Sequence, residues 1–176
     1  FLSYYDGYLK IPNKELMLEF EKALEDESFG YVSKIIENSK SMLKATVNKD
    51  VKIIEEILHD IHNSEIPILQ YNDENSLSCV LTLAYLSARD NYRVEREEKT
   101  GKGYADFTFH PRRKNDTAFI VELKKDEKPE IALKQIRSKE YVEKFKRENM
   151  GKKILAVAIC YDSKEKEHHC LIEEID

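Results

Sequence analysis

The chain has 176 residues, of which 41% are hydrophobic and 36% are charged, and its formal net charge is −5. This composition can bury the core of one domain and excludes wholesale disorder. No apolar run approaches the roughly 20 residues that cross a bilayer, so we expect no membrane segment.

The first ten residues, FLSYYDGYLK, lack the long apolar stretch of a secretory signal. Three widely spaced cysteines, Cys79, Cys160 and Cys170, argue against a disulfide framework. We therefore expect a cytoplasmic protein whose cysteines are buried as small hydrophobic side chains. Because the chain does not begin with Met, we expect it to be a piece of a longer protein.

The first part of the chain reads as helical. Apolar residues recur at helical spacing over 14–25, 29–45 and 50–62, and again over 74–89. Pro67 interrupts the pattern within 63–73, which we expect to be a connection. His59 and His62 lie three residues apart in the third helix. A metal site there needs a third ligand that the neighbourhood does not offer, so we expect both on a solvated helix face.

The second part alternates between strand and helix patterns. Strands are predicted over 92–97, 104–110, 117–124, 153–161 and 168–175, with one helix over 129–147 opened by Pro129. These patterns predict an α/β fold, a mixed β-sheet flanked by helices, preceded by an N-terminal helical region. We expect a connector and helical region over 1–70 and the α/β core over 71–176. Neighbours in a strand face opposite ways, so His168, His169 and Cys170 should not converge on one ion.

Charge is distributed unevenly. Residues 101–153 contain 15 Lys and Arg against 9 Asp and Glu, whereas the rest of the chain contains 14 against 25. Such asymmetry points to a polyanion bound by one region. A lysine-rich, solvated helix face explains the same count, and the sequence leaves both interpretations open.

One constellation of polar residues carries chemistry. Glu122 and Lys124 follow the apolar run Ala118–Val121, and alternation places both on one face of the strand. Asp106 lies in the preceding strand, and antiparallel pairing of the two strands brings it beside Glu122. Two adjacent carboxylates repel each other and favour a divalent cation between them, and hard oxygen ligands select Mg²⁺ or Mn²⁺. The competing interpretation is an edge hairpin that exposes all three residues.

These residues resemble the PD-(D/E)XK nuclease superfamily, and more narrowly its bacterial nuclease-like domains found C-terminal to AAA-type ATPase-like domains. The similarity covers most of 71–161. It is carried by YNDEN, EREEKTGKGYADFTFHP, AFIVELKK and ALKQIRSKEY. The opening DGYLKIPNKEL is similar to the connector that precedes the nuclease domain in these proteins. The resemblance therefore implies a restriction-endonuclease-like fold and an N-terminal ATPase-like domain in the full-length protein.

The resemblance also implies roles for individual residues. Asp106 and Glu122 correspond to the metal-binding acids, the Leu123 carbonyl to a further metal ligand, and Lys124 to the catalytic lysine. Three residues correspond to accessory positions of the site: Glu74, Gln135 and Tyr141. Tyr104 replaces the Arg usual in the glycine-rich turn, which removes a contact expected to help hold the substrate.

Each accessory residue has a structural alternative. Glu74 suits the first turn of a helix because of the helix dipole. Gln135 fits a helix–sheet seam, and Tyr141 fits a core position.

Two functions follow from these observations. The first is a Mg²⁺- or Mn²⁺-dependent endo- or exonuclease that hydrolyses phosphodiester bonds, with DNA as substrate and a homodimer as the form that cuts two strands. The second is an inactive nuclease-fold module that serves protein or nucleic-acid interaction beside an ATPase-like domain. In a third, purely structural interpretation, Asp106, Glu122 and Lys124 form an ion-paired cluster.

Overall fold

The computed structural model describes residues 3–5, 8–10, 18, 30–65, 74–96, 106–138 and 140–175. The chain divides into two compact units, 1–37 and 38–176. Our helix over 14–25 lies outside the described residues apart from Leu18, and so do the glycine-rich segment 97–105 and the connection 66–73. The boundary expected at 70/71 stays a prediction.

The first unit contains a small hairpin. Strands β1 (Ser3–Tyr5) and β2 (Tyr8–Lys10) pair antiparallel, with Ser3 opposite Lys10. This stretch lies in the expected connector, and its strands were not predicted.

The second unit is built on a five-stranded mixed sheet in the order β3-β4-β5-β6-β7. Its strands are β3 (Tyr92–Arg96), β4 (Phe107–Pro111), β5 (Ala118–Lys125), β6 (Ile154–Asp162) and β7 (Glu167–Ile175). Neighbours pair antiparallel except β5 and β6, which run parallel. The mixed sheet that the strand patterns predicted is confirmed, with boundaries shifted by one to three residues.

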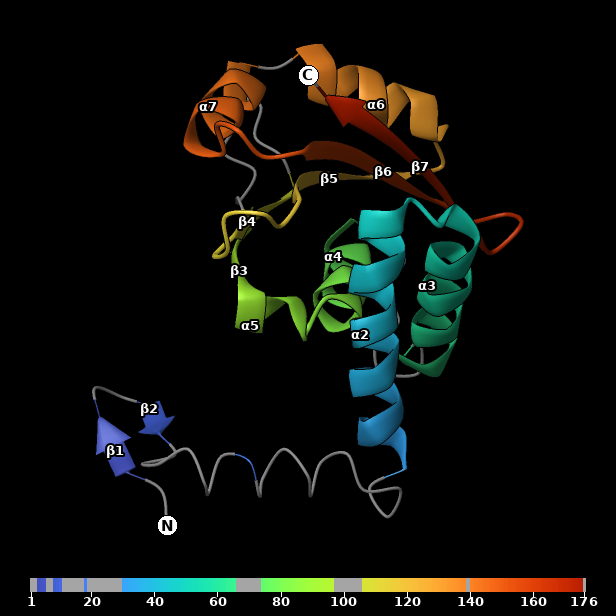
Figure 1. Cartoon of the computed structure of the whole chain (residues 1–176). Helices are drawn as coiled ribbons and strands as arrows, with labels where there is room; N and C mark the ends of the chain where they lie inside the picture. The colour runs from blue at the N-terminus through green and yellow to red at the C-terminus, as the bar shows by residue number, and fades with distance from the viewer. Residues whose placement is uncertain are drawn as a thin grey trace. The chain divides into compact units, whose positions relative to one another are not determined.

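Helices cover both faces of this sheet (Figure 1). Helices α2 (Tyr31–Asn48), α3 (Val51–Glu65), α4 (Glu74–Ala84) and the short α5 (Ala88–Asn91) precede β3. Helices α6 (Pro129–Ser138) and α7 (Glu140–Glu148) form the crossover that two parallel strands require. We predicted one helix over 129–147 and one over 74–89. The structure has two helices in each place, α6 and α7 in the first and α4 and α5 in the second.

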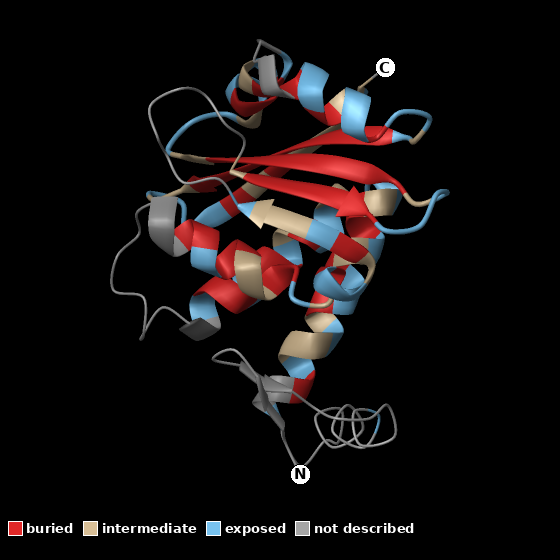
Figure 2. Ribbon diagram, turned by 90° about the vertical axis from the view of Figure 1, so that its left-hand side faces the viewer, coloured by how far each residue is buried: buried red, intermediate tan, exposed pale blue. Residues whose placement is uncertain are grey.

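The two faces of the sheet differ in side-chain size. Toward α3 and α4 the strands present Phe107, Phe109 and Phe119, and the Phe109 and Phe119 rings stack with centroids 4.2 Å apart. Toward α6 and α7 they present small residues such as Ala118 and Ala156. Figure 2 shows the central strands as buried from both sides, which explains the nearly continuous apolar sequence of β6.

The histidines and cysteines correct two predictions. His62 is buried at 2% exposure, and its Nδ1 lies 3.2 Å from Nε2 of His168 in β7, so only His59 lies on a solvated helix face. Cys79 is exposed, whereas Cys160 and Cys170 are buried as expected. The side chain of Cys79 falls between the apolar positions of α4, so its apolar neighbours in sequence do not surround it in space.

Candidate active site

Strand β5 delivers two polar residues to the α6 side of the sheet. Its odd-numbered residues Val121 and Leu123 belong to the core under α3 and α4. Glu122 and Lys124 therefore point the other way, after Ala118 and Ile120, which pack in the core under α6 and α7. β5 is the middle strand of the sheet, and Glu122 is 2% exposed. The interpretation as an exposed edge hairpin is thus wrong.

Lys124 and Gln135 are partners of the Glu122 carboxylate. Lys124 Nζ lies 3.4 Å from Glu122 Oε1, and the Lys124 side chain is only 15% exposed. Gln135 of α6 donates a hydrogen bond from Nε2 to the same oxygen. A buried carboxylate costs several kcal/mol unless it is paired and hydrogen-bonded. The Lys124 ammonium and the Gln135 amide supply that compensation for the buried Glu122.

Asp106 directly precedes β4 in the chain and contacts β5. Phe107 pairs with Val121, so one further step in the register sets Asp106 opposite Glu122. The Leu123 N–H donates a hydrogen bond to Asp106 Oδ2 at 2.7 Å. The two backbone groups of a strand residue point toward the same neighbouring strand. The Leu123 carbonyl oxygen therefore lies on the Asp106 side of β5.

The donor chemistry at this point suits a hard divalent cation. The Asp106 and Glu122 carboxylates and the Leu123 carbonyl offer oxygen atoms only, which Mg²⁺ and Mn²⁺ prefer. Asp106 is half-buried, which leaves room for the water molecules that Mg²⁺ retains. The structure brings together five of the residues named from sequence: Asp106, Glu122, Leu123, Lys124 and Gln135.

Two accessory residues are placed by their backbone alone. Glu74 is the first residue of α4, and Tyr141 lies in the first turn of α7. Their side chains, like Tyr104, lie outside the described residues. Gln135 does sit at the seam between helix and sheet, and there it contacts Glu122.

A nearby thiol is chemically inert. Cys160 of β6 is the register partner of Lys124. Burial raises the pKa of the Cys160 thiol to about 12, and the Glu127 carboxylate adds to this rise. The thiol therefore stays protonated near neutral pH and offers neither a nucleophile nor a soft metal ligand.

One group of potential metal ligands was not predicted from the sequence. Glu165, Glu167 and His169 place one ligand atom each within 4.8 Å of the others, at the turn from β6 into β7. The signal was present as Glu-x-Glu-x-His, a spacing of two that suits one face of a strand. We had considered His169 only with its neighbours His168 and Cys170.

The family model of the PD-(D/E)XK nuclease superfamily matches residues 72–169, more than half of the chain. The chain belongs to the PD-(D/E)XK nuclease superfamily. The match contains all seven residues named from the resemblance, and the observed mixed sheet with flanking helices is consistent with the fold of the superfamily. Comparisons with curated proteins and with solved structures gave no match.

The superfamily match agrees with two coarser expectations. It implies a nucleic-acid substrate, and its members typically use a divalent metal. Within the described residues, no helix is long and apolar enough to cross a membrane.

Proposed function

We propose that this PD-(D/E)XK domain is a metal-dependent nuclease that hydrolyses phosphodiester bonds in DNA. The observation that carries the proposal is the buried Glu122 carboxylate on the middle strand, with Lys124 beside it and Asp106 at the adjoining peptide. A purely structural role explains the buried Glu122 and Lys124 poorly, because two apolar side chains would fill the same space with a smaller desolvation penalty.

Each residue has a role that follows from its position. Asp106, Glu122 and the Leu123 carbonyl would hold Mg²⁺ or Mn²⁺, which would supply Lewis acidity toward the phosphodiester and toward a bound water. Gln135 fixes the orientation of the Glu122 carboxylate through its hydrogen bond. Lys124 holds the attacking water or stabilises negative charge on the phosphoryl oxygens, in a largely buried setting where such charge interactions are strong.

Charge supports a nucleic-acid substrate. Exposed basic residues of the α6–α7 crossover, among them Lys134, Arg137 and Lys144, belong to the segment 101–153 with its positive balance. Several of these charges are already paired within the protein, as in Arg137 with Glu173 and Lys144 with Glu148. We therefore expect the domain to bind DNA with moderate affinity, and we expect this affinity to fall as the salt concentration rises.

Cleavage assays test the proposal. Plasmid and single-stranded DNA are incubated with wild type, Lys124→Ala and Lys125→Ala in Mg²⁺, in Mn²⁺ and with a chelator. The matched control Lys125 is the next residue along β5, on its opposite face. We expect metal-dependent cleavage by the wild type, a loss of at least ~100-fold in Lys124→Ala, and a rate near wild type in Lys125→Ala. Equal cleavage by all three proteins would place the activity elsewhere.

The ion pair itself favours a second candidate. Because Lys124 and Gln135 already compensate Glu122, the same cluster can serve an inactive module that binds nucleic acid or protein. That candidate predicts no cleavage with either metal, and DNA binding that does not change between Lys124→Ala and Lys125→Ala.

A further inference from the structure

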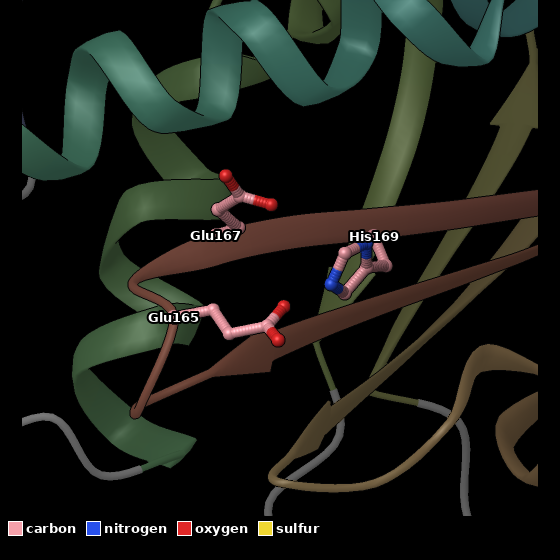
Figure 3. A group of neighbouring side chains, drawn as sticks. All are labelled: Glu165, Glu167 and His169. Atoms are coloured by element: carbon pink, nitrogen blue, oxygen red, sulfur yellow. The ribbon is translucent and has the colours of Figure 1, made fainter.

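We propose a second divalent-cation site, formed by Glu165, Glu167 and His169, which takes a metal of the Zn²⁺ or Mn²⁺ class. In the described part of the chain this is the one group in which three acidic, histidine or cysteine ligand atoms converge, all within 4.8 Å. Figure 3 shows the three side chains gathered at the turn that joins β6 to β7.

The donor set distinguishes this site from an ordinary acidic patch. An imidazole nitrogen joins two carboxylates, and such mixed nitrogen and oxygen ligands suit Zn²⁺ or Mn²⁺ better than Mg²⁺ or Ca²⁺. Ligand atoms around an ion with bonds of 2.0–2.2 Å lie about 3 Å apart. Glu165 and Glu167 are exposed, so rotation of their side chains can close the remaining distance.

The backbone of the turn is held in place by other carboxylates. Asp162 Oδ1 accepts hydrogen bonds from the N–H groups of Lys164 at 2.8 Å and Glu165 at 3.0 Å. Asp126 Oδ1 accepts one from the Ser163 N–H at 2.8 Å. Hydrogen bonds from the Ser163 side chain and N–H lower the pKa of Asp126, and those from the Glu165 and Lys164 N–H groups lower the pKa of Asp162. Asp126 and Asp162 therefore hold the backbone of the turn, next to the exposed carboxylates of Glu165 and Glu167.

The sheet register relates this site to the candidate active site. His169 pairs with Cys160, and Cys160 pairs with Lys124. Residues in such a row share one face, so His169 lies on the side of the sheet that carries Lys124, two strand spacings or about 10 Å away. A cation at Glu165, Glu167 and His169 would add positive charge on the face of the sheet where a polyanion would reach Lys124. The binding of metal itself does not depend on whether the domain cleaves DNA.

Calorimetric titration with Zn²⁺ tests the proposal. The background is Cys79→Ser, because the exposed Cys79 thiol would bind Zn²⁺ itself. The variants are Glu167→Gln/His169→Gln, Asp106→Asn/Glu122→Gln, and the control His59→Gln, which removes an exposed histidine on α3. We expect one Zn²⁺ event that persists in excess Mg²⁺. Glu167→Gln/His169→Gln should abolish it, whereas the control and the active-site variant retain it.

Two results would overturn the second site. One is an unchanged Zn²⁺ isotherm in Glu167→Gln/His169→Gln, and the other is the absence of any Zn²⁺ event in the background protein. Because Glu167 is exposed and His169 is partly exposed, circular dichroism should show both proteins equally folded. A Zn²⁺ event that depends on His169 in a protein without cleavage would reject the nuclease proposal and keep this one.

Discussion

The two faces of the central sheet are both buried, yet they are built differently. The face under α3 and α4 is filled by large rings, with Phe109 and Phe119 stacked and Tyr85 against both. The face under α6 and α7 uses small residues, and its row on β5 ends in Glu122 and Lys124. Large rings fill volume, whereas alanines let a helix approach closely. The comparison teaches that the first face supplies stability and the second supplies the position of α6 over the candidate site.

Removal of a stacked ring should show the largest effect on stability. Phe119 is fully buried, so Phe119→Ala leaves a cavity and should lower the free energy of unfolding by about 3–5 kcal/mol. Urea denaturation measures the change. Cleavage per folded molecule should stay near wild type, because Phe119 faces away from Glu122. A specific loss of cleavage with little loss of stability would contradict the division between the faces.

Enlargement of the small-residue face should damage the site. Ala158 is the register partner of Glu122 and is fully buried under α6. In Ala158→Leu the extra volume should cost about 1–3 kcal/mol. It should also move α6, and with it Gln135, away from Glu122. We expect cleavage to fall together with stability, unlike in Phe119→Ala. A cleavage rate near wild type would show that close approach of α6 is unnecessary.

The face under α3 has its own polar exception, which should appear as pH dependence. His168 packs against His62 and Tyr161, and its Nδ1 has no hydrogen-bond partner among the described residues. Burial, together with the nearby His62, His59 and His169, lowers the pKa of His168 to about 3. The native imidazole thus stays neutral below the unfolded pKa of about 6.5, where the unfolded chain takes up a proton.

The contribution of His168 to the free energy of unfolding should therefore be fully present above that pKa and be lost as the pH falls below it. Between pH 7 and pH 5 the His168 contribution amounts to about 2 kcal/mol. Urea denaturation of wild type and His168→Gln at both pH values isolates it, since Gln keeps a polar atom near His62. The variant should show a smaller decrease. Equal decreases in the two proteins would assign the pH dependence to other groups, such as His110, whose pKa burial also lowers.

An exposed ion pair gives the smallest effect and the contrast to Glu122 and Lys124. Arg137 of α6 and Glu173 of β7 pair with side chains 59% and 38% exposed. Arg137→Ala should change the free energy of unfolding by less than ~1 kcal/mol, because water screens such pairs. Lys124→Ala should cost more, since it leaves Glu122 buried without its cation. Similar costs in the two variants, measured by urea denaturation, would mean that burial does not distinguish the pairs.

The strands and the candidate site were largely predictable because they depend on local patterns. Alternation in 117–124 assigns Glu122 and Lys124 to one face, and a short polar turn brings Asp106 within reach. The contact between His62 and His168 joins residues 106 positions apart, and it depends on how α3 packs against β7. Periodicity along one helix carries no such information. The exposure of Cys79 was missed for a related reason, because the rotation of α4 about its axis decides it.

The assignment of the crossover to two helices was also beyond the sequence patterns. Residues 129–147 keep a helical spacing throughout, yet α6 ends at Ser138 and α7 begins at Glu140. At the other end of α7, Asn149 Nδ2 donates a hydrogen bond to the Phe145 carbonyl at 2.9 Å and lies 3.1 Å from His110 Nδ1, which fixes the end of the helix to β4.

Calorimetric titration with Mn²⁺ tests the central claim most directly. The protein carries Glu167→Gln/His169→Gln to silence the second proposed site, with and without Asp106→Asn/Glu122→Gln. DNA made uncleavable by phosphorothioate linkages is present in both titrations, so that substrate phosphate can complete the coordination. The account predicts one Mn²⁺ event of micromolar-to-millimolar affinity that disappears with the two active-site substitutions. Equal isotherms for the two folded proteins would contradict the assignment of the metal to Asp106 and Glu122.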